Sequence, residues 1–285
     1  MIKKDTNINV LENNKIKCLI DIKGGRILSF SRDTKEFLSD KNINPNLYGS
    51  TFWPAPQSIW NWPPPIMLDE AEYNTQNNNN KLILISPADD ILNIFFKKEF
   101  ILTNNYLEIN YIIKNISVKN IKVAPWEVTR VTKGGIAFFP KGFNKVWGNN
   151  IDLMKIKEEN NIIWYKSELI KYPDHTKLFN NGKEGWLAYV QDDYIFIKQF
   201  EEILPKYIAP GEDGIEIYAN PTDNYIELEN IGKYEQIMPG NEIKYNVKWY
   251  IEKIDDNISV YAGNMDLVKL VRKILFNKKP EVNSK

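Results

Sequence analysis

Short segments of strand length recur along almost the whole chain, and they constrain its fold more than any other feature. Each one is an apolar run or an alternation of apolar and polar residues, and turn-forming residues separate it from the next. This spacing is typical of hairpins. The segments are residues 15–21, 26–31, 81–86, 91–96, 106–113, 121–131, 162–166, 186–190, 194–200, 214–219, 225–229 and 242–251. The sequence therefore predicts a mainly β fold, built as two packed antiparallel layers or as a barrel.

A short helix is predicted near the C-terminus. Asn264 is its N-cap, and apolar residues at 267, 268, 270, 271 and 275 follow at helical spacing. The 285 residues are 43% hydrophobic, which is enough for a sizeable core. Because no repeat or linker divides the chain, we expect one domain over residues 1–285, with its core between residues 15 and 275.

The charge and cysteine content of the chain indicate which kinds of binding partner and which cellular compartment to expect. Lys plus Arg equals Asp plus Glu at 37 each, so no net field favours nucleic acid or an anionic membrane. The lone Cys18 can form no intramolecular disulfide, and its apolar neighbours predict a buried thiol. The first thirty residues lack the apolar run of a secretory signal, and no stretch approaches the ~20 apolar residues of a membrane span. We therefore expect a cytoplasmic protein whose partner is a small molecule; the sequence does not indicate its oligomeric state.

Residues 49–69, GSTFWPAPQSIWNWPPPIMLD, contain three tryptophans and five prolines. Proline lacks a backbone donor and is confined to sheet edges and bulges, so this segment is predicted to be a shaped loop. Trp53, Trp60 and Trp62 either plug one end of the β fold or form the wall of a ligand site. The amide of Gln57 could bond hydroxyl groups between the rings. Flat apolar faces beside amides suit a sugar, and each covered face is worth about 1–3 kcal/mol.

Polar side chains in the later strands fall on common faces. By the period of two, Glu216 and Tyr218 share one face of their strand, and Glu229 opposes the apolar Leu228. Together with Lys198 these side chains would form a polar floor beneath the aromatic loop. The alternative is that they are the solvated side of an antiparallel sheet.

A second cluster surrounds Pro125. Trp126 and Arg130 fall on one face of the predicted strand, and Glu127 and Thr129 fall on the other. A bulge at Pro125 could re-aim one of the charged side chains. Arg130 would either stack on an aromatic ring or contact the ligand.

His175 is the single histidine and lies in a predicted loop, where it is either solvated or catalytic. No His/Cys pair has the spacing of metal ligands, and the sequence has no phosphate loop, dinucleotide glycine motif or nucleophile elbow. We therefore expect neither a metal nor a cofactor.

The motifs GGRILSF at 24–30, IELE at 226–229, MPGNE at 238–242 and VKWY at 247–250 resemble those of the aldose 1-epimerases, the galactose mutarotases. The aromatic motifs at 52–57 and 60–64, together with PWEVTRV at 125–131, look more like the DUF4380 family, a branch of the mutarotase-like superfamily. The resemblance spans residues 15–275.

This resemblance implies a β-supersandwich of two large antiparallel sheets with a sugar site on its concave face. It also implies that Glu229 is the general base, which takes the proton of the anomeric hydroxyl while an acid protonates the ring oxygen. Mutarotases use a histidine as this acid, whereas the corresponding strand here reads PWEV at 125–128. Glu127 with a pKa raised by burial, Lys198 or Tyr218 could supply that proton instead, and His175 is a further catalytic candidate.

Three hypotheses on function follow. The first is a carbohydrate-binding protein of mutarotase-like fold, acting either as a binder or as an aldose 1-epimerase on a free sugar or sugar derivative. The second is a non-catalytic β-sandwich interaction module whose aromatic loop docks a protein. The third is a hydrolase or lyase, in which Glu229 and either Glu216 or Glu127 form a carboxylate pair about 5–9.5 Å apart.

Overall fold

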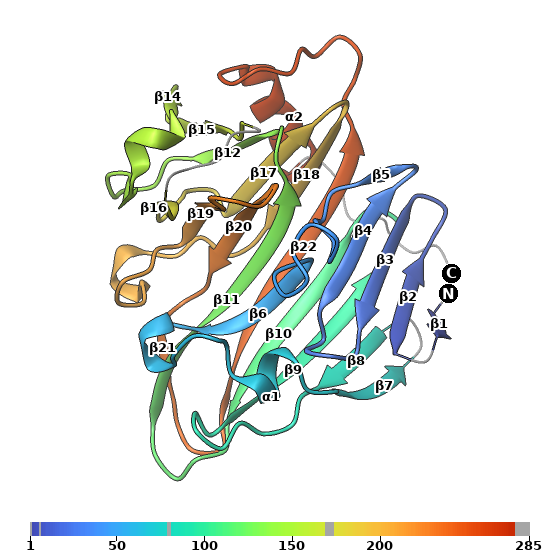
Figure 1. Ribbon diagram of the computed structural model, residues 1–285, viewed down its shortest axis with the longest axis vertical. Helices are drawn as coiled ribbons and strands as arrows, with labels where there is room; N and C mark the ends of the chain where they lie inside the picture. The colour runs from blue at the N-terminus through green and yellow to red at the C-terminus, as the bar shows by residue number, and fades with distance from the viewer. Residues whose placement is uncertain (1, 6, 79–80, 169–173, 277–285) are drawn as a thin grey trace.

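Two large antiparallel sheets pack face to face in the structure, a computed structural model that describes residues 2–5, 7–78, 81–168 and 174–276 (Figure 1). Among these residues the first sheet has twelve strands and the second has ten. The prediction of a mainly β fold in two packed layers is confirmed. No helix in the described part of the chain is long and apolar enough to cross a membrane.

The first sheet carries the N-terminal strands at one edge and strands from the middle of the chain at the other. Its order is β1-β2-β3-β4-β6-β11-β20-β19-β16-β13, with β5 paired to β4 and β21 paired to β11. The strands are β1 (Ile2–Asp5), β2 (Ile8–Glu12), β3 (Ile16–Asp21), β4 (Ile27–Arg32), β5 (Lys35–Glu36), β6 (Ser50–Ala55), β11 (Ile121–Thr132), β13 (Trp147–Asn149), β16 (Thr176–Asn180), β19 (Ile215–Ala219), β20 (Tyr225–Ile231) and β21 (Glu235–Ile237).

The second sheet has the order β14-β15-β12-β17-β18-β22-β10-β9-β8-β7. Its strands are β7 (Asn74–Asn78), β8 (Lys81–Ile85), β9 (Ile94–Leu102), β10 (Leu107–Asn115), β12 (Ile136–Pro140), β14 (Lys157–Glu159), β15 (Ile162–Lys166), β17 (Trp186–Gln191), β18 (Tyr194–Gln199) and β22 (Glu242–Lys253). Short helical turns connect strands at η1 (Gln57–Ile59), α1 (Ile66–Asp69), η2 (Ile151–Met154) and η3 (Pro205–Tyr207).

The main core lies between the sheets and is rich in aromatic rings. Phe52 of β6 stacks on Tyr111 of β10 with ring centroids 4.1 Å apart, and Phe30 of β4 meets the edge of Trp249 of β22 at 5.4 Å. Each of these contacts joins one sheet to the other. Cys18 of β3 is completely buried, as predicted, and burial raises the pKa of its thiol.

The predicted C-terminal helix is present as α2 (Met265–Phe276) and covers the outer face of the second sheet (Figure 1). Asn264 is its N-cap, because its side-chain oxygen accepts the backbone N–H of Asp266 at 3.0 Å. Leu267, Val268 and Val271 are fully buried in the second apolar cluster, beside residues of β17 and β18.

The prediction that residues 49–69 form a loop is wrong for their first part, since β6 is a strand hydrogen-bonded to β11. Pro54 lies opposite Pro125. The carbonyl of Pro125 accepts the N–H of Gly232 at 2.8 Å, so the peptide groups of Pro125 point away from β6. The two prolines thus form a pair that needs no hydrogen bond between its strands. On its other side β6 pairs with β4 only at Ser50, so the ladder requires no donor from Pro54.

Candidate functional site

The two faces of β11 were predicted correctly, and they belong to different environments. Glu127 and Thr129 point toward the second sheet, where Glu127 accepts hydrogen bonds from Tyr111 and Trp249. Trp126 and Arg130 therefore point outward from the first sheet. The register of β11 with β6 and with β20 is continuous, so no bulge at Pro125 re-aims either charged side chain.

Two rows of side chains run across this outer face, because directly paired residues in an antiparallel sheet share a face. The pairing of β11, β20, β19, β16 and β13 places Val128, Glu229, Glu216, Phe179 and Trp147 in one row. The neighbouring row is Arg130, Glu227, Tyr218 and Lys177. Acidic, basic and aromatic groups are thus brought together from five strands.

Four indole rings form one group at one end of these rows, here called the tryptophan cluster: Trp53, Trp60, Trp62 and Trp126. The ring of Trp53 lies 5.9 Å from Trp60, 6.0 Å from Trp62 and 5.5 Å from Trp126. Trp53 donates its Nε1–H to Asp69 at 2.7 Å, which fixes the orientation of its ring. Trp62 is 55% exposed whereas the other three are buried, so the cluster is open to solvent at Trp62.

An acidic centre, formed by Lys177, Glu216 and Glu229, lies next to the tryptophan cluster. The Lys177 Nζ is 2.5 Å from Glu216 Oε2 and 3.0 Å from Glu229 Oε2. Trp126 donates its Nε1–H to the same Glu229 oxygen at 2.8 Å. Both carboxylates are completely buried, while the Lys177 side chain is 17% exposed. The early tryptophans thus lie near Glu229, with Trp126 between Trp53 and the carboxylate.

The charges of the acidic centre do not balance. Burial raises the pKa of Glu216 well above its ordinary value, the nearby Glu229 raises it further, and Lys177 opposes this change. Burial alone would lower the pKa of Lys177, but the two carboxylates raise it. One ammonium can compensate only one of two carboxylates, so the folded protein favours a proton on Glu216.

Arg130 takes the first of the two roles that the sequence left open, because its guanidinium lies beside an aromatic ring; its contact with a ligand stays a prediction. Its guanidinium lies 5.3 Å from the ring centroid of Trp53, and its Nε lies 2.8 Å from Glu227 Oε1. Its Nη2, like Oε1 of Glu229, is buried and has no hydrogen-bond partner among the described residues. Buried polar atoms are normally paired, so these two atoms have unused bonding capacity.

His175 and Tyr218 extend the site on the side away from the tryptophan cluster. The Nδ1 of His175 is 2.6 Å from the hydroxyl of Tyr218, and the His175 side chain is exposed. Burial, followed by the charge of Glu227, raises the pKa of Tyr218, so the phenol keeps its proton. His175 thus joins the site through Tyr218.

Two of the expected site residues lie elsewhere. Lys198 and Glu127 are completely buried between the sheets and form an ion pair of 2.9 Å. Lys198 also donates to Thr129 Oγ1 and to the carbonyl of Leu228, both at 2.8 Å, so its three donors are satisfied. The polar floor expected from Lys198, Glu216, Tyr218 and Glu229 therefore lacks Lys198, because β18 belongs to the second sheet. Glu127 is likewise separated from Glu229 by the thickness of the first sheet.

Gln57 lies in η1 at the edge of the tryptophan cluster, with its backbone N–H bonded to Glu212 at 2.9 Å. Sequence reasoning missed Lys177 and Glu227 as site residues. The alternation in Thr176–Asn180 is a signal for Lys177, and the IELE motif at 226–229 is a signal for Glu227. Only the pairing of β16 with β19 shows which groups Lys177 contacts.

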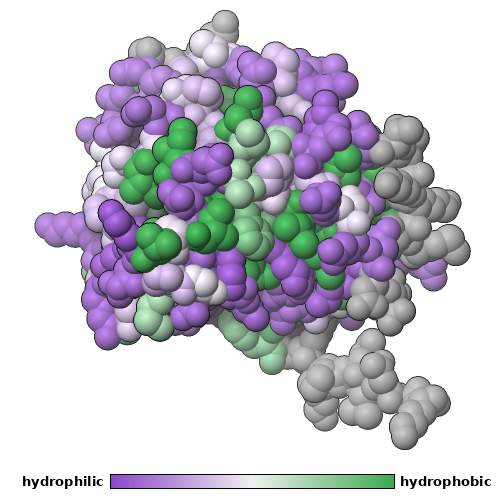
Figure 2. All heavy atoms as spheres, turned by 90° about the horizontal axis from the view of Figure 1, so that it is seen from below, coloured by the Kyte–Doolittle hydropathy of each residue, from purple (hydrophilic) through white to green (hydrophobic). Residues whose placement is uncertain are grey.

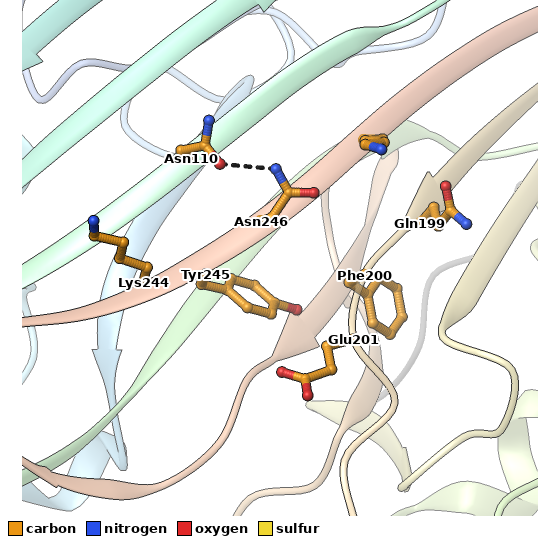
Figure 3. A pocket seen from close by; sticks show the side chains of 8 residues that line it. Asn110, Gln199, Phe200, Glu201, Lys244, Tyr245 and Asn246 are labelled. Atoms are coloured by element: carbon orange, nitrogen blue, oxygen red, sulfur yellow. Dashed lines mark hydrogen bonds between the residues drawn. The ribbon is translucent and has the colours of Figure 1, made fainter. Parts of the chain in front are cut away.

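A hollow of about 390 Å³ lies on a different part of the molecule, beside β10, β18 and β22 (Figure 3). Its lining includes Asn110, Asn246, Lys244 and Glu201. The amide of Asn246 donates to Asn110 at 2.8 Å, as the dashed line in Figure 3 shows, and to Glu108. Because this hollow has neither buried unpaired charges nor a group of indole rings, we place the candidate site on the outer face of the first sheet instead.

Comparison with known proteins gives one family match and many similar folds. The model of a domain of unknown function, DUF4380, matches residues 48–252. A galactose mutarotase-like protein from Lactobacillus casei has a TM-score of 0.62 at 11% identity, covering 86% of this chain and 100% of its own. A putative aldose 1-epimerase from Klebsiella pneumoniae has a TM-score of 0.63 at 10% identity, covering 97% of this chain and 90% of its own.

A curated relative is also similar in sequence. The membrane protein insertase YidC of Blochmanniella floridana is 26% identical over an alignment of 224 residues that covers 70% of this chain and 35% of the insertase. This chain thus spans about a third of the length of that relative.

Proposed function

The chain belongs to the DUF4380 family and has the galactose mutarotase-like fold, and from this premise we propose that the outer face of its first sheet binds a saccharide. The observation that carries the proposal is the unused bonding capacity of Glu229 Oε1 and Arg130 Nη2 next to four indole rings. A sugar presents hydroxyl groups around its rim and C–H groups on its faces. It would cover the exposed indole of Trp62 and bond the two buried polar atoms once the side chains above them move aside.

The finer proposal is an aldose 1-epimerase. Glu229 Oε1 takes the proton of the anomeric hydroxyl, while Tyr218 donates its phenolic proton to the ring oxygen and regains one through His175. The bond from C1 to the ring oxygen breaks, its electron pair goes to that oxygen, and a carbonyl forms at C1. Rotation about the adjacent bond and the reverse steps close the ring on the other face. Lys177 and Trp126 hold Glu229 Oε2, which leaves Oε1 for the substrate.

Binding and catalysis can be tested separately on one panel of neutral aldoses. We expect saturation-transfer NMR to show contact between a sugar of the panel and the protein, and polarimetry to show faster anomer exchange. Glu229→Gln keeps the size of the side chain and removes its basicity, so exchange should fall by about 10²–10⁴-fold. Glu242→Gln, which changes a surface carboxylate of β22, is the matched control and should behave as wild type.

The outcomes separate the two levels of the proposal. Contact without exchange leaves a sugar-binding protein and removes the epimerase. Equal exchange rates in Glu229→Gln and wild type contradict the role of Glu229. No contact with any aldose of the panel contradicts saccharide binding by this site.

One observation favours the alternative of a protein-docking module. Trp62 is 55% exposed, and Ile66 and Met67 of α1 are 61% and 42% exposed. Figure 2 views the molecule from the end at which α1 lies in Figure 1, and it shows apolar residues gathered there with polar residues among them.

Acrylamide quenching of tryptophan fluorescence discriminates between the two functions. Protection by sugars that is lost in Trp62→Phe supports the saccharide site, whereas unchanged quenching favours docking.

A further inference from the structure

We propose that the ligand is a neutral saccharide of at least two sugar units, held at its far end by a second aromatic platform that Trp147 and Phe179 form. This inference rests on the proposed saccharide site and extends it along the same face. The platform is at the edge of the first sheet, where β13 pairs with β16.

The register shows that both platforms lie on one surface. Trp147 pairs with Phe179, Phe179 with Glu216, and Glu216 with Glu229, so all four side chains share the face on which Trp126 lies. The backbones of β11 and β13 lie four strand spacings of about 4.8 Å apart, roughly 19 Å. The inner rings lie closer together, because Lys177 Nζ is 5.1 Å from the centroid of Trp126 and 5.2 Å from that of Phe179. The acidic centre lies between the two aromatic groups. A ligand that covers both exposed rings, Trp62 and Trp147, has to cross the acidic centre, which favours one longer than a single sugar ring.

The geometry of Trp147 is suited to stacking. Its ring lies nearly parallel to that of Phe179, with centroids 4.1 Å apart and an angle of 12° between the planes. Its Nε1–H donates to Asp213 Oδ2 at 3.0 Å, so the ring is fixed from two directions. Trp147 is nevertheless 43% exposed, while Phe179 beside it is 6% exposed. A rigid, exposed indole loses little conformational entropy when a flat ligand covers it.

Lys177 connects the two platforms. Its Nζ is 5.1 Å from the ring centroid of Trp126 and 5.2 Å from that of Phe179. Because its side chain is partly exposed above Glu216 and Glu229, it is the polar group that a ligand meets between the aromatic rings. An ammonium group in this position can donate to sugar hydroxyls while its two carboxylates hold it in place.

Charge favours a neutral ligand over an acidic one. The face carries Glu212, Glu216, Glu227 and Glu229, and the cations Arg130 and Lys177 are already paired, Arg130 with Glu227 and Lys177 with the acidic centre. A uronate or a sugar phosphate would place another negative charge close to these carboxylates, which would repel it. Neutral hydroxyl groups can accept from the cations and donate to the carboxylates.

The test is a titration with neutral oligosaccharides of one to four units from several linkage series, followed by calorimetry or tryptophan fluorescence. For a series that binds, we expect affinity to rise by about tenfold between one unit and the length that reaches Trp147. Trp147→Ala should remove this gain and leave the affinity for the single sugar unchanged. Trp147→Phe should keep part of it. Tyr261→Ala, which removes an exposed aromatic side chain elsewhere, is the control.

Three results would overturn the inference while the saccharide site itself stands. They are an affinity independent of ligand length, an equal effect of Trp147→Ala on short and long ligands, and equally tight binding of phosphorylated or uronate-containing chains. If no saccharide of any length binds, the proposed function fails as well. Thermal unfolding of Trp147→Ala checks that the variant is folded, so that a missing rise in affinity with ligand length is not caused by unfolding.

Discussion

At the scale of single residues, Lys177 holds two buried carboxylates with one positive charge. Glu216 accepts the backbone N–H of Asp213 through its Oε1 at 2.8 Å, and its Oε2 faces the ammonium. Because burial raises the pKa of Glu216 in the folded state, the folded protein binds a proton there more tightly than the unfolded chain does. The stability that this proton contributes is fully present below the unfolded pKa and is lost as the pH rises through the folded pKa.

The change Glu216→Gln should therefore alter how stability depends on pH. A glutamine resembles the neutral acid and does not titrate. The free energy of unfolding of the mutant should therefore rise relative to that of wild type as the pH rises above about 4.5. The gain should be about 1.4 kcal/mol for each unit by which the folded pKa is raised. Urea unfolding at pH 4 to 8 measures it, with Glu242→Gln as the surface control. Parallel curves for wild type and Glu216→Gln would contradict the assignment of the proton to Glu216.

At the scale of elements, short local signals decide where strands and helices begin and end. Strand β9 begins at Ile94 and not at the predicted residue 91, because Asp89 accepts the backbone N–H groups of Ile91 and Leu92 and Asn93 has a positive φ of 55°. These features form a turn. The helix α2 begins where its cap residue Asn264 bonds both Asp266 and the carbonyl of Ser259.

Removal of this cap should destabilise the protein by about 1–2 kcal/mol, since Asn264→Ala leaves the N–H of Asp266 and the carbonyl of Ser259 without their partner. Urea unfolding measures the loss. Lys269→Ala, on the exposed side of the same helix, changes helix propensity without touching the cap and should cost far less. Equal losses in the two variants would show that the cap contributes nothing.

At the scale of the whole molecule, the two sheets share their core and their buried charges. Lys198 of β18 bonds Glu127, Thr129 and Leu228 of the first sheet, and Tyr111 and Trp249 of the second sheet donate to Glu127. Removal of either charge of this pair would leave the other buried and unpaired, which typically costs 3–5 kcal/mol. Neither sheet is therefore expected to keep its structure without the other.

A single cooperative unfolding transition is the expected consequence, in line with one domain over the chain. Fluorine NMR of 5-fluorotryptophan can follow Trp126 on the outer face of the first sheet and Trp164 in the cluster beneath α2. Both native signals should vanish at the same urea concentration. Two separated midpoints would instead indicate two independent folding units.

The sequence by itself determined the fold class, most strands, the capped helix and the two faces of β11, because alternation, turn residues and caps act between neighbours in the chain. It also indicated that Trp53, Trp60 and Trp62 belong with Glu229. Only the tertiary structure decided which side of each strand faces the interior. Alternation gives two faces but does not say which sheet a strand joins, so Lys198 was expected beside Glu229 and is found between the sheets. Lys177 reaches Glu216 and Glu229 only because β16 pairs with β19, a contact between strands that chain-local signals do not specify.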